Sequence, residues 1–202
     1  MPTPQPRTSE VTVAPLGAAD EDEFVAAVRA SRQLHHPWID LADSPERFAS
    51  VVERLGRDDY EAYLIRHGCG GLVGYVSVGN IVRGPFQSAY LGYGAFVGHE
   101  GRGLMREGLR AVIDVAFGEL GLHRVEANVQ PSNTRSLALV RRLGFEKEGF
   151  SPRYLMVDGA WRDHERWALR NTAMERVRGA PEASRPRDAT KPPELGASTH
   201  CD

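Results

Sequence analysis

The chain has 202 residues, 41% hydrophobic and 26% charged, so at roughly 150 residues per domain it should hold one domain with some chain left over. Its 25 Lys and Arg residues against 27 Asp and Glu leave a formal charge of -2, which excludes a broad positive field able to collect nucleic acid or anionic lipid. The two cysteines, Cys69 and Cys201, are too few and too far apart for a disulfide scaffold or a metal motif. With no secretion signal and no run of about 18 apolar residues, we expect a cytoplasmic protein with no nucleic-acid or membrane partner.

Composition divides the chain into three parts. Residues 1–9 hold three prolines, and residues 175–202 mix Pro, Ala, Ser and both charges with almost no large apolar side chain. Such segments cannot bury enough apolar surface to offset the entropy lost on ordering, so we expect both to be disordered. Residues 10–170 are expected to form a single folded domain.

Taken in chain order, alternation of apolar and polar residues first predicts a strand over 11–15. Asp20 can cap a helix that runs through Leu34, and Ser44-Pro45 predicts the start of a second helix, because serine accepts from the first free amides and proline suits the first helical position. Three strands rich in β-branched and aromatic residues follow, separated by turn signals, at 60–66, 71–81 and 87–97. Their spacing predicts an antiparallel meander.

The second half begins with a glycine-rich segment, 98–103, followed by a long helix with one apolar stripe. A strand over 124–129 comes next, and then a helix that Asn133 opens and Gly144 ends. Asp158-Gly159 is a two-residue hairpin signal, which predicts that the last two strands form a hairpin around it.

The junction of strand, glycine-rich segment and helix carries the chemistry. Free amides at a helix N-terminus and the helix dipole attract an anion, and glycines let it approach the backbone closely. Arg106 stands where a dinucleotide fingerprint needs its third glycine, and Leu104-Met105 stand where a P-loop needs Lys and Ser/Thr, so both motifs are excluded. What remains is a magnesium-free cradle for a diphosphate, which coenzyme A fits. The alternative is that Gly101 and Gly103 only build a tight turn.

Several segments together resemble the GNAT superfamily of acetyl-CoA-dependent N-acetyltransferases, and its RimJ/RimL-type branch in particular. Residues 100–105 read Glu-Gly-Arg-Gly-Leu-Met where the family has Gln/Arg-x-x-Gly-x-Gly/Ala. Segments similar to RimJ-type proteins follow in the same order: NIVRGPF (80–86), YLGY (90–93), PSNTRS (131–136), LGFEKEGF (143–150) and DGAWRDH (158–164). The resemblance implies an α+β GNAT fold, a twisted, mixed, mostly antiparallel sheet flanked by helices with splayed central strands. It also implies acetyl-CoA as co-substrate and an amine as acceptor.

The resemblance assigns cofactor-binding residues as well. The pantetheine arm would pair with strand backbone around Ala95, Phe96 and Val97, as an added strand would. Asn133 would lie near this arm, with a helix cap as the alternative role. The diphosphate would lie on the backbone amides of Gly101, Arg102, Gly103, Leu104 and Met105.

Catalytic and acceptor residues are less regular. Many family members have a tyrosine that protonates the leaving thiolate, and Val140 stands at that position. Ser136 is therefore expected to contact the thioester and to protonate the thiolate. The alternative is that Ser136 is only a small packing residue. The glutamate base of RimL-type enzymes aligns with Leu155, which leaves Glu126 as the best carboxylate, or else as an ion-pair partner on the strand face. Residues expected to border the acceptor are His35, Trp38 and Tyr93. No metal is expected, because His35 and His36 diverge and lack a third ligand at motif spacing.

The missing base bears on the acceptor. An α-amine has a pKa of about 7.7 to 8.0, roughly 2.5 units below that of lysine, which is worth about 3.4 kcal/mol in preparing the neutral nucleophile. We therefore expect direct acetyl transfer to a protein N-terminus, of the ribosomal-protein alanine type. The alternatives are an acetyltransferase of a small-molecule amine, such as a polyamine or antibiotic, and a sensor that binds acetyl-CoA without turnover.

Overall fold

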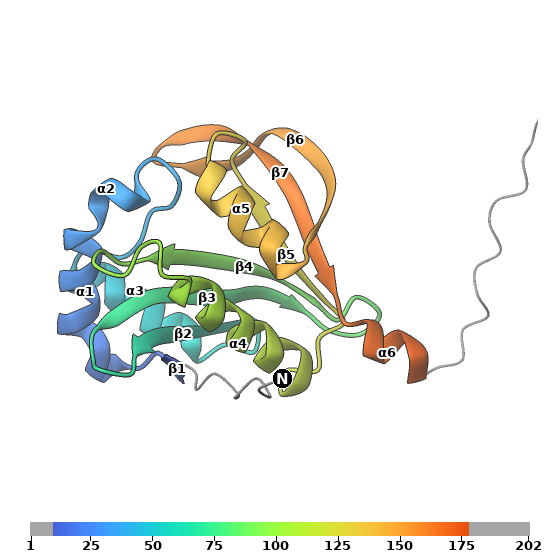
Figure 1. The fold of residues 1–202 in the computed structure, drawn as a ribbon, viewed down its shortest axis with the longest axis horizontal. Coiled ribbons are helices and arrows are strands. Elements are labelled where there is room, and N and C mark those ends of the chain that lie inside the picture. The colour runs from blue at the N-terminus through green and yellow to red at the C-terminus, as the bar shows by residue number, and fades with distance from the viewer. Residues whose placement is uncertain (1–9, 178–202) are drawn as a thin grey trace, which may run out of the picture. The chain divides into compact units, whose positions relative to one another are not determined.

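A seven-stranded sheet in the order β1-β2-β3-β4-β5-β7-β6 organises this computed structural model, which describes residues 10–177 (Figure 1). The strands are β1 (Val11–Pro15), β2 (Tyr60–His67), β3 (Leu72–Val82), β4 (Ser88–Ala95), β5 (Arg124–Val129), β6 (Glu146–Val157) and β7 (Ala160–Arg170). Every neighbouring pair is antiparallel except β4 and β5, which are parallel. The mixed sheet confirms the expected α+β class and the meander of β2, β3 and β4.

The helices of this unit, which extends to Asn171, are the 3-10 turn η1 (Ala18–Asp20), α1 (Glu21–Ala30), α2 (Arg32–His35), α3 (Pro45–Leu55), α4 (Leu104–Gly118) and α5 (Thr134–Leu143). Helix α6 (Thr172–Val177) belongs to a second unit. It includes residues 175–177, which were expected to begin a disordered tail. The expectations for residues 1–9 and 178–202 lie outside the described part of the chain.

Helices cover both faces of the sheet at β2 and β3. Side chains of β2 alternate between two cores: Leu64 packs with α1 and α3, whereas Ile65 packs with α4 and α5 on the other face. Burial on both faces explains why this strand has a nearly continuous apolar run. Helix α4 comes closest to β2 at Gly108, where an added Cβ would lie 2.4 Å from Cγ2 of Ile65. A larger side chain there would push α4 off the sheet.

The helix expected to run from an Asp20 cap through Leu34 is wrong in two respects. The Asp20 side chain makes no capping bond to α1 and instead accepts the amide of Gly17 at 2.8 Å. The helix also breaks into α1 and α2 at Ser31. Ser31 is fully buried, and its hydroxyl accepts a hydrogen bond from the backbone N–H of Val97, 3.1 Å away. A contact with a residue 66 positions further along the chain therefore accompanies the break, and the local apolar pattern carries no sign of it.

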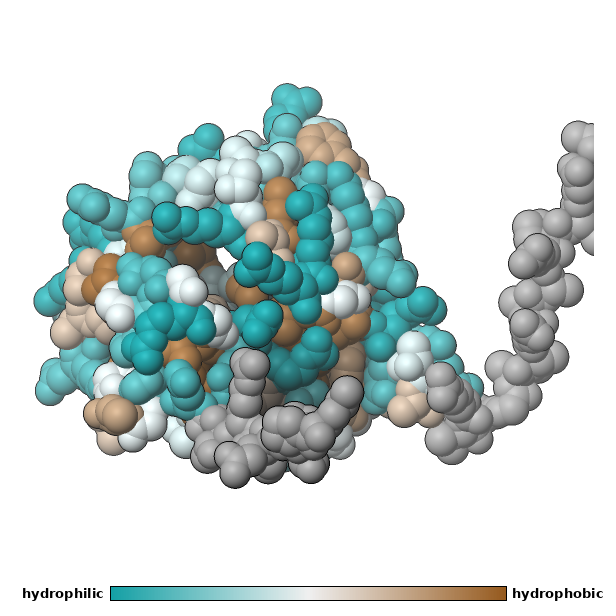
Figure 2. Space-filling model, in the orientation of Figure 1, coloured by the Kyte–Doolittle hydropathy of each residue, from teal (hydrophilic) through white to brown (hydrophobic). Residues whose placement is uncertain are grey.

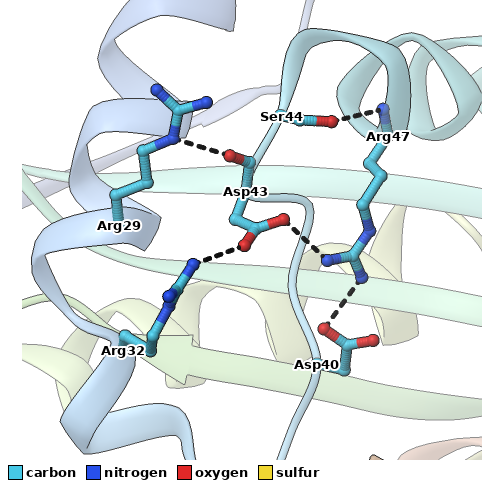
Figure 3. A network of polar contacts seen from close by, with 6 residues as sticks. All are labelled: Arg29, Arg32, Asp40, Asp43, Ser44 and Arg47. Carbon is cyan, nitrogen blue, oxygen red and sulfur yellow. Dashed lines mark hydrogen bonds and ion pairs between the residues drawn. The ribbon is translucent and has the colours of Figure 1, made fainter.

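A polar network ties the segment after α2 to the start of α3 (Figure 3). The Asp43 carboxylate accepts from Arg32 at 2.9 Å and from Arg47 at 2.8 Å, and Arg47 also pairs with Asp40 at 2.8 Å. Ser44 caps α3 as expected, accepting from the amide of Arg47. The segment is also tied to the end of β5, where the Gln130 side chain donates to the backbone carbonyl of Pro37. These contacts hold the 36–44 segment beside the sheet.

The remaining local signals behave as expected. Asn133 caps α5, and Gly144 ends it in the left-handed conformation. Asp158 and Gly159 both have positive φ, 51° and 69°, as a two-residue turn between β6 and β7 requires.

Candidate active site

A cleft opens where β4 and β5 separate. Their parallel pairing is limited to Ser88, Ala89 and Tyr90 against residues 124–126, and beyond these pairs the two strands diverge (Figure 1). The divergence confirms the expected splayed central strands. A cavity of about 1630 Å³ lies here, lined by β4, the glycine-rich loop, α5 and the β6–β7 hairpin. Figure 2 shows the surface hollowed on this face, with apolar surface inside the hollow and hydrophilic side chains around it.

The edge of β4 presents backbone groups to this cleft. The Phe96 N–H donates to the carbonyl of Val73 at 2.9 Å, so the alternation of an antiparallel ladder turns the backbone groups of Tyr93 and Ala95 away from β3, toward the cleft. Nε2 of His35 already donates to the Ala95 carbonyl at 2.8 Å. The amides of Phe96 and Val97, expected to face pantetheine, are occupied by Val73 and by the Ser31 hydroxyl respectively. The expectation therefore needs correction at Phe96 and Val97: the free edge lies at Tyr93 and at Ala95, the first of the three expected residues.

The glycine-rich loop has the conformation that an anion cradle needs. Gly98, Gly101 and Gly103 have φ of 93°, 75° and 84°, in the left-handed region that other residues rarely adopt. Gly103 is the N-cap of α4, and its carbonyl accepts the first helical bond, from the amide of Glu107 at 3.1 Å. The amides of residues 104–106 consequently have no partner within the helix. They form the donor group on which an anion can lie.

The side chains of the loop divide between cleft and core. Those of Arg102 and Met105 line the cleft together with Gly101 and Gly103, whereas the Leu104 side chain is buried in the core, so that only its amide is available to a ligand. Arg106 and Arg135 add positive charge to the cleft wall. Free amides, glycines and guanidinium groups together fit the diphosphate of coenzyme A.

Glu100 is the exception within this donor group. Its carboxylate accepts the backbone N–H of Gly98 at 2.8 Å. Hydrogen bonds from its own amide and from those of Gly98 and His99 lower the pKa of this carboxyl, so it is ionised at neutral pH. A fixed negative charge therefore lies on amides next to those that would hold a diphosphate.

Two hydroxyl groups meet at the other end of the β4 edge. The Tyr93 hydroxyl lies 2.6 Å from Oγ of Ser136, which sits in the first turn of α5. Burial raises the pKa of Tyr93 to about 12, so the phenol keeps its proton at neutral pH. Asn133 lines the cleft beside them and its Oδ1 accepts the amide of Ser136 at 3.1 Å, which confirms its role as a cap.

A second group of polar side chains lines the opposite face of the splayed sheet. Tyr90 pairs with Glu126, and Asn128 pairs with Arg166, so Tyr90, Asn128 and His164 share the face that Tyr93 does not occupy. Burial, followed by a hydrogen bond to Tyr154, raises the pKa of Tyr90 to about 12. The Oδ1 atom of Asn128 is buried and has no hydrogen-bond partner within residues 10–177. His35 and Trp38 also line the cleft, from the α2 side.

Comparison with known proteins identifies the fold and its chemistry. The family model described as "Acetyltransferase (GNAT) domain" matches residues 10–146. The chain belongs to the GNAT acetyltransferase family. It is 39% identical over 170 residues to a probable N-acetyltransferase, YjcK, of Bacillus subtilis, covering 80% of this chain and 94% of that protein. It is an acyltransferase.

Two further similar proteins have names that state an acceptor or a bound cofactor derivative. A ribosomal protein uS5-alanine N-acetyltransferase of Escherichia coli is 46% identical over 98 residues, which span 48% of this GNAT chain and only half of that enzyme. The structure of Mycobacterium smegmatis RimJ in complex with CoA-disulfide superposes with a TM-score of 0.74 at 28% identity, covering 81% of this chain and 83% of that one. The GNAT fold uses acetyl-CoA, and this neighbour was solved with a CoA derivative.

The geometry of this GNAT site corrects the expected base. Oε1 of Glu126 is 2.8 Å from Nε of Arg124, whose other nitrogens grip Glu148. Glu126 is absent from the cleft lining. The alternative role, an ion-pair partner on the strand face, is the one that the contacts support.

Several residues that line the cleft carry no local sequence signal that would place them there. The odd spacing of Tyr90 and Tyr93 on one strand turns their side chains to opposite faces, but nothing local shows which face meets α5. His164 and Tyr154 lie within or beside segments similar to RimJ-type proteins, yet only the tertiary fold brings them to the cleft. In the described part of the chain, no group of three or more His, Cys, Asp and Glu side chains could hold a metal ion. No helix there has both the length and the apolar character to cross a membrane.

Proposed function

We propose that this GNAT protein transfers the acetyl group of acetyl-CoA to the N-terminal α-amine of a protein, of the ribosomal-protein alanine type, by direct attack. The observation that carries the proposal is a single cleft with two unlike ends. One end has free helix amides and arginines that suit a diphosphate, and the other has neutral polar side chains that suit an uncharged amine.

On the cofactor side, we assign the diphosphate to the amides of Gly101, Arg102, Gly103, Leu104 and Met105. The backbone groups of Ala95, as expected, and of Tyr93, in place of Phe96 and Val97, supply the strand edge for the pantetheine amides. Pairing at Ala95 requires His35 to leave the Ala95 carbonyl or to share it. Asn133 then borders the pantetheine arm while it caps α5.

The hydroxyl pair of Tyr93 and Ser136 would act on the leaving sulfur. A thiol has an ordinary pKa of about 8.5, whereas that of Tyr93 is about 12, so full proton transfer from this pair to a thiolate is unfavourable. Hydrogen-bond donation to the developing thiolate costs no such transfer. Ser136 is therefore proposed as the donor to sulfur, with Tyr93 orienting its hydroxyl.

On the acceptor side, the carboxylates that line the cleft are already engaged. Asp40 is paired with Arg47, and Glu100 lies on the Gly98 amide. A lysine ammonium would need strong help to lose its proton, whereas on the order of 10% of an α-amine is neutral at pH 7. His35 and Trp38 are proposed to border the acceptor chain. The 46% identity to the uS5-alanine enzyme supports the same acceptor class.

A thiol-release assay with acetyl-CoA tests this proposal. The acceptors are short peptides that differ in their first residue, each matched by the same peptide with a blocked N-terminus and a free internal lysine. Spermidine and an aminoglycoside form further arms. We expect thiol release with free N-termini, strongest for alanine, and none with the blocked peptides.

The other outcomes separate the alternatives. Release only with spermidine or the aminoglycoside would replace the protein acceptor by a small-molecule amine. Calorimetric binding of acetyl-CoA without release from any acceptor would favour a sensor. Failure to bind acetyl-CoA at millimolar concentration would overturn both.

A further inference from the structure

One buried ionisable group in the cleft has no role in the account above. His164 lies on β7, is only 2% exposed, and lines the cavity. It shares with Tyr90 and Asn128 the face of the sheet opposite Tyr93, which we call the acceptor face. Its ring packs against that of Tyr154, with centroids 6.3 Å apart.

The hydrogen bond of His164 fixes which nitrogen is free. Nδ1 lies 2.9 Å from the backbone carbonyl of Arg162. A carbonyl only accepts, so Nδ1 carries the proton, and in the neutral ring Nε2 holds the lone pair. No partner for Nε2 occurs within residues 10–177. His164 therefore presents to the cleft an imidazole nitrogen that is oriented, unprotonated and available.

We propose that Nε2 of His164 is the general base that removes the proton from the attacking amine nitrogen, directly or through one water molecule. The inference deepens the proposed function and rests on it. As the new N–C bond forms, the C–S bond breaks and the sulfur leaves with its electron pair. The proton on nitrogen passes to Nε2 and from there to solvent through the cleft.

The surroundings of His164 keep its ring neutral, and therefore able to accept a proton, at pH 7. Burial lowers the pKa of His164, while the Arg162 carbonyl and the charge of Asp163 act in the opposite direction, so the ring is neutral at pH 7. An amine nitrogen that has attacked a carbonyl is more acidic than the free ammonium, so a neutral imidazole of lowered pKa can serve as its proton acceptor. Other titratable or charged side chains on the strands packed around His164 are Arg124 and Glu126 of β5, Arg153 and Tyr154 of β6, and Arg162 and Arg166 of β7.

His35, the other buried histidine of the cleft, is placed differently. Its Nε2 donates to the Ala95 carbonyl at the edge of β4, so this nitrogen carries a proton and cannot accept one. His164 is the histidine whose free nitrogen belongs to the acceptor face.

The decisive variant is His164→Asn. The asparagine amide can keep the hydrogen bond to the Arg162 carbonyl but has no atom at the position of Nε2. We expect kcat/KM for an alanine peptide to fall by about 10² to 10⁴ at pH 7, with unchanged affinity for acetyl-CoA by calorimetry. In wild type the acid limb of the pH profile of kcat/KM should reflect the ionisation of His164 as well as that of the amine. In the variant only the ionisation of the amine should remain.

Two further proteins keep the result interpretable. His164→Ala should recover activity when imidazole is added, in proportion to its free-base fraction, which a purely structural role would not allow. His35→Gln keeps a donor to the Ala95 carbonyl and should retain the acid limb, even if its KM changes.

Activity of His164→Asn within threefold of wild type would overturn the inference and leave the proposed function standing. So would a loss of activity with an unaltered pH profile and no rescue by imidazole. If wild type binds acetyl-CoA but acetylates no acceptor, the proposed function and the inference fall together.

Discussion

Glu100 puts a negative charge where the proposed function needs a positive field. Its carboxylate lies on the Gly98 amide at 2.8 Å, and the backbone amides around it lower its pKa. The family motif has Gln or Arg at this position, and either would remove the repulsion. At the proposed site this carboxylate would repel a diphosphate and compete with it for the amides of the loop.

Glu100→Gln should consequently bind acetyl-CoA more tightly than wild type, by several-fold at low ionic strength and less at high salt. Glutamine keeps a carbonyl oxygen for the Gly98 amide while it removes the charge. Calorimetric titration at two salt concentrations measures the effect. Asp114→Asn removes the same charge from the exposed face of α4 and should leave the affinity unchanged. Equal affinity of Glu100→Gln and wild type would mean that the diphosphate lies elsewhere.

The Tyr93–Ser136 pair gives a second prediction for single residues. Ser136→Ala removes the proposed donor to the leaving sulfur and should lower kcat by about 100- to 1000-fold, the range for loss of one donor to a developing charge. Tyr93→Phe keeps the ring in the core and removes only the hydroxyl that orients Ser136, so a smaller loss is expected. A steady-state assay that separates kcat from KM measures both. A Ser136→Ala enzyme with normal kcat would remove the serine from the mechanism.

At the scale of elements, α4 contains a glycine that its packing requires, although glycine has a low helix propensity. Gly108 faces β2 so closely that an added Cβ would lie 2.4 to 2.6 Å from three carbons of Ile65, which is fully buried. Glycine costs a helix about 1 kcal/mol relative to alanine, whereas overpacking a core costs about 1 to 3 kcal/mol. The packing term is the larger one.

Gly108→Ala should therefore lower the free energy of unfolding by about 1 kcal/mol, despite the better helix former. Gly118, at the other end of α4, has nothing within 4 Å of an added Cβ, so Gly118→Ala should be neutral or stabilising by up to about 1 kcal/mol. Urea unfolding of the two variants compares them directly. A stabilised Gly108→Ala protein would show that Ile65 can move aside.

Elements were predictable where their signals are local. Ser44 and Asn133 as caps, Gly144 as a helix end and Asp158-Gly159 as a turn act through bonds and dihedral angles within a few residues. The break between α1 and α2 was not predictable, because it accompanies a hydrogen bond from a distant loop to Ser31.

For the molecule as a whole, the two buried histidines couple stability to pH. Burial lowers the pKa of both His35 and His164 below its ordinary value of 6.5, against the opposing effect of a carbonyl partner in each case. Below about pH 6.5 the unfolded chain takes up protons that the folded chain does not, so the free energy of unfolding decreases toward acid. Carboxylates with lowered pKa values, such as Glu148 beside Arg124, lose their contribution only at lower pH.

We therefore expect unfolding by urea at pH 7.5, 6.5 and 5.5 to show falling stability below pH 6.5, by at most about 1.4 kcal/mol per pH unit for each histidine. A protein carrying both His35→Gln and His164→Asn should show a flatter dependence over the same interval. Stability that stays constant in wild type down to pH 5.5 would mean that both rings are protonated in the folded state.

Short stretches of the sequence determine much of the local structure of this protein. The glycine-rich loop, the caps, the meander and the final hairpin depend on conformational preferences and hydrogen bonds between near neighbours, and so does the anion cradle at the start of α4. The order of the elements, together with these motifs, is what made the family recognisable.

The side-chain contacts inside the cleft were decided by tertiary structure. Tyr93 meets Ser136 across 43 positions, and His164 reaches the cleft through the register of β7 on β5. Such contacts depend on strand order, register and the separation of β4 from β5, which arise only when both faces of the sheet are buried together. A residue's own neighbours in the chain carry no record of them.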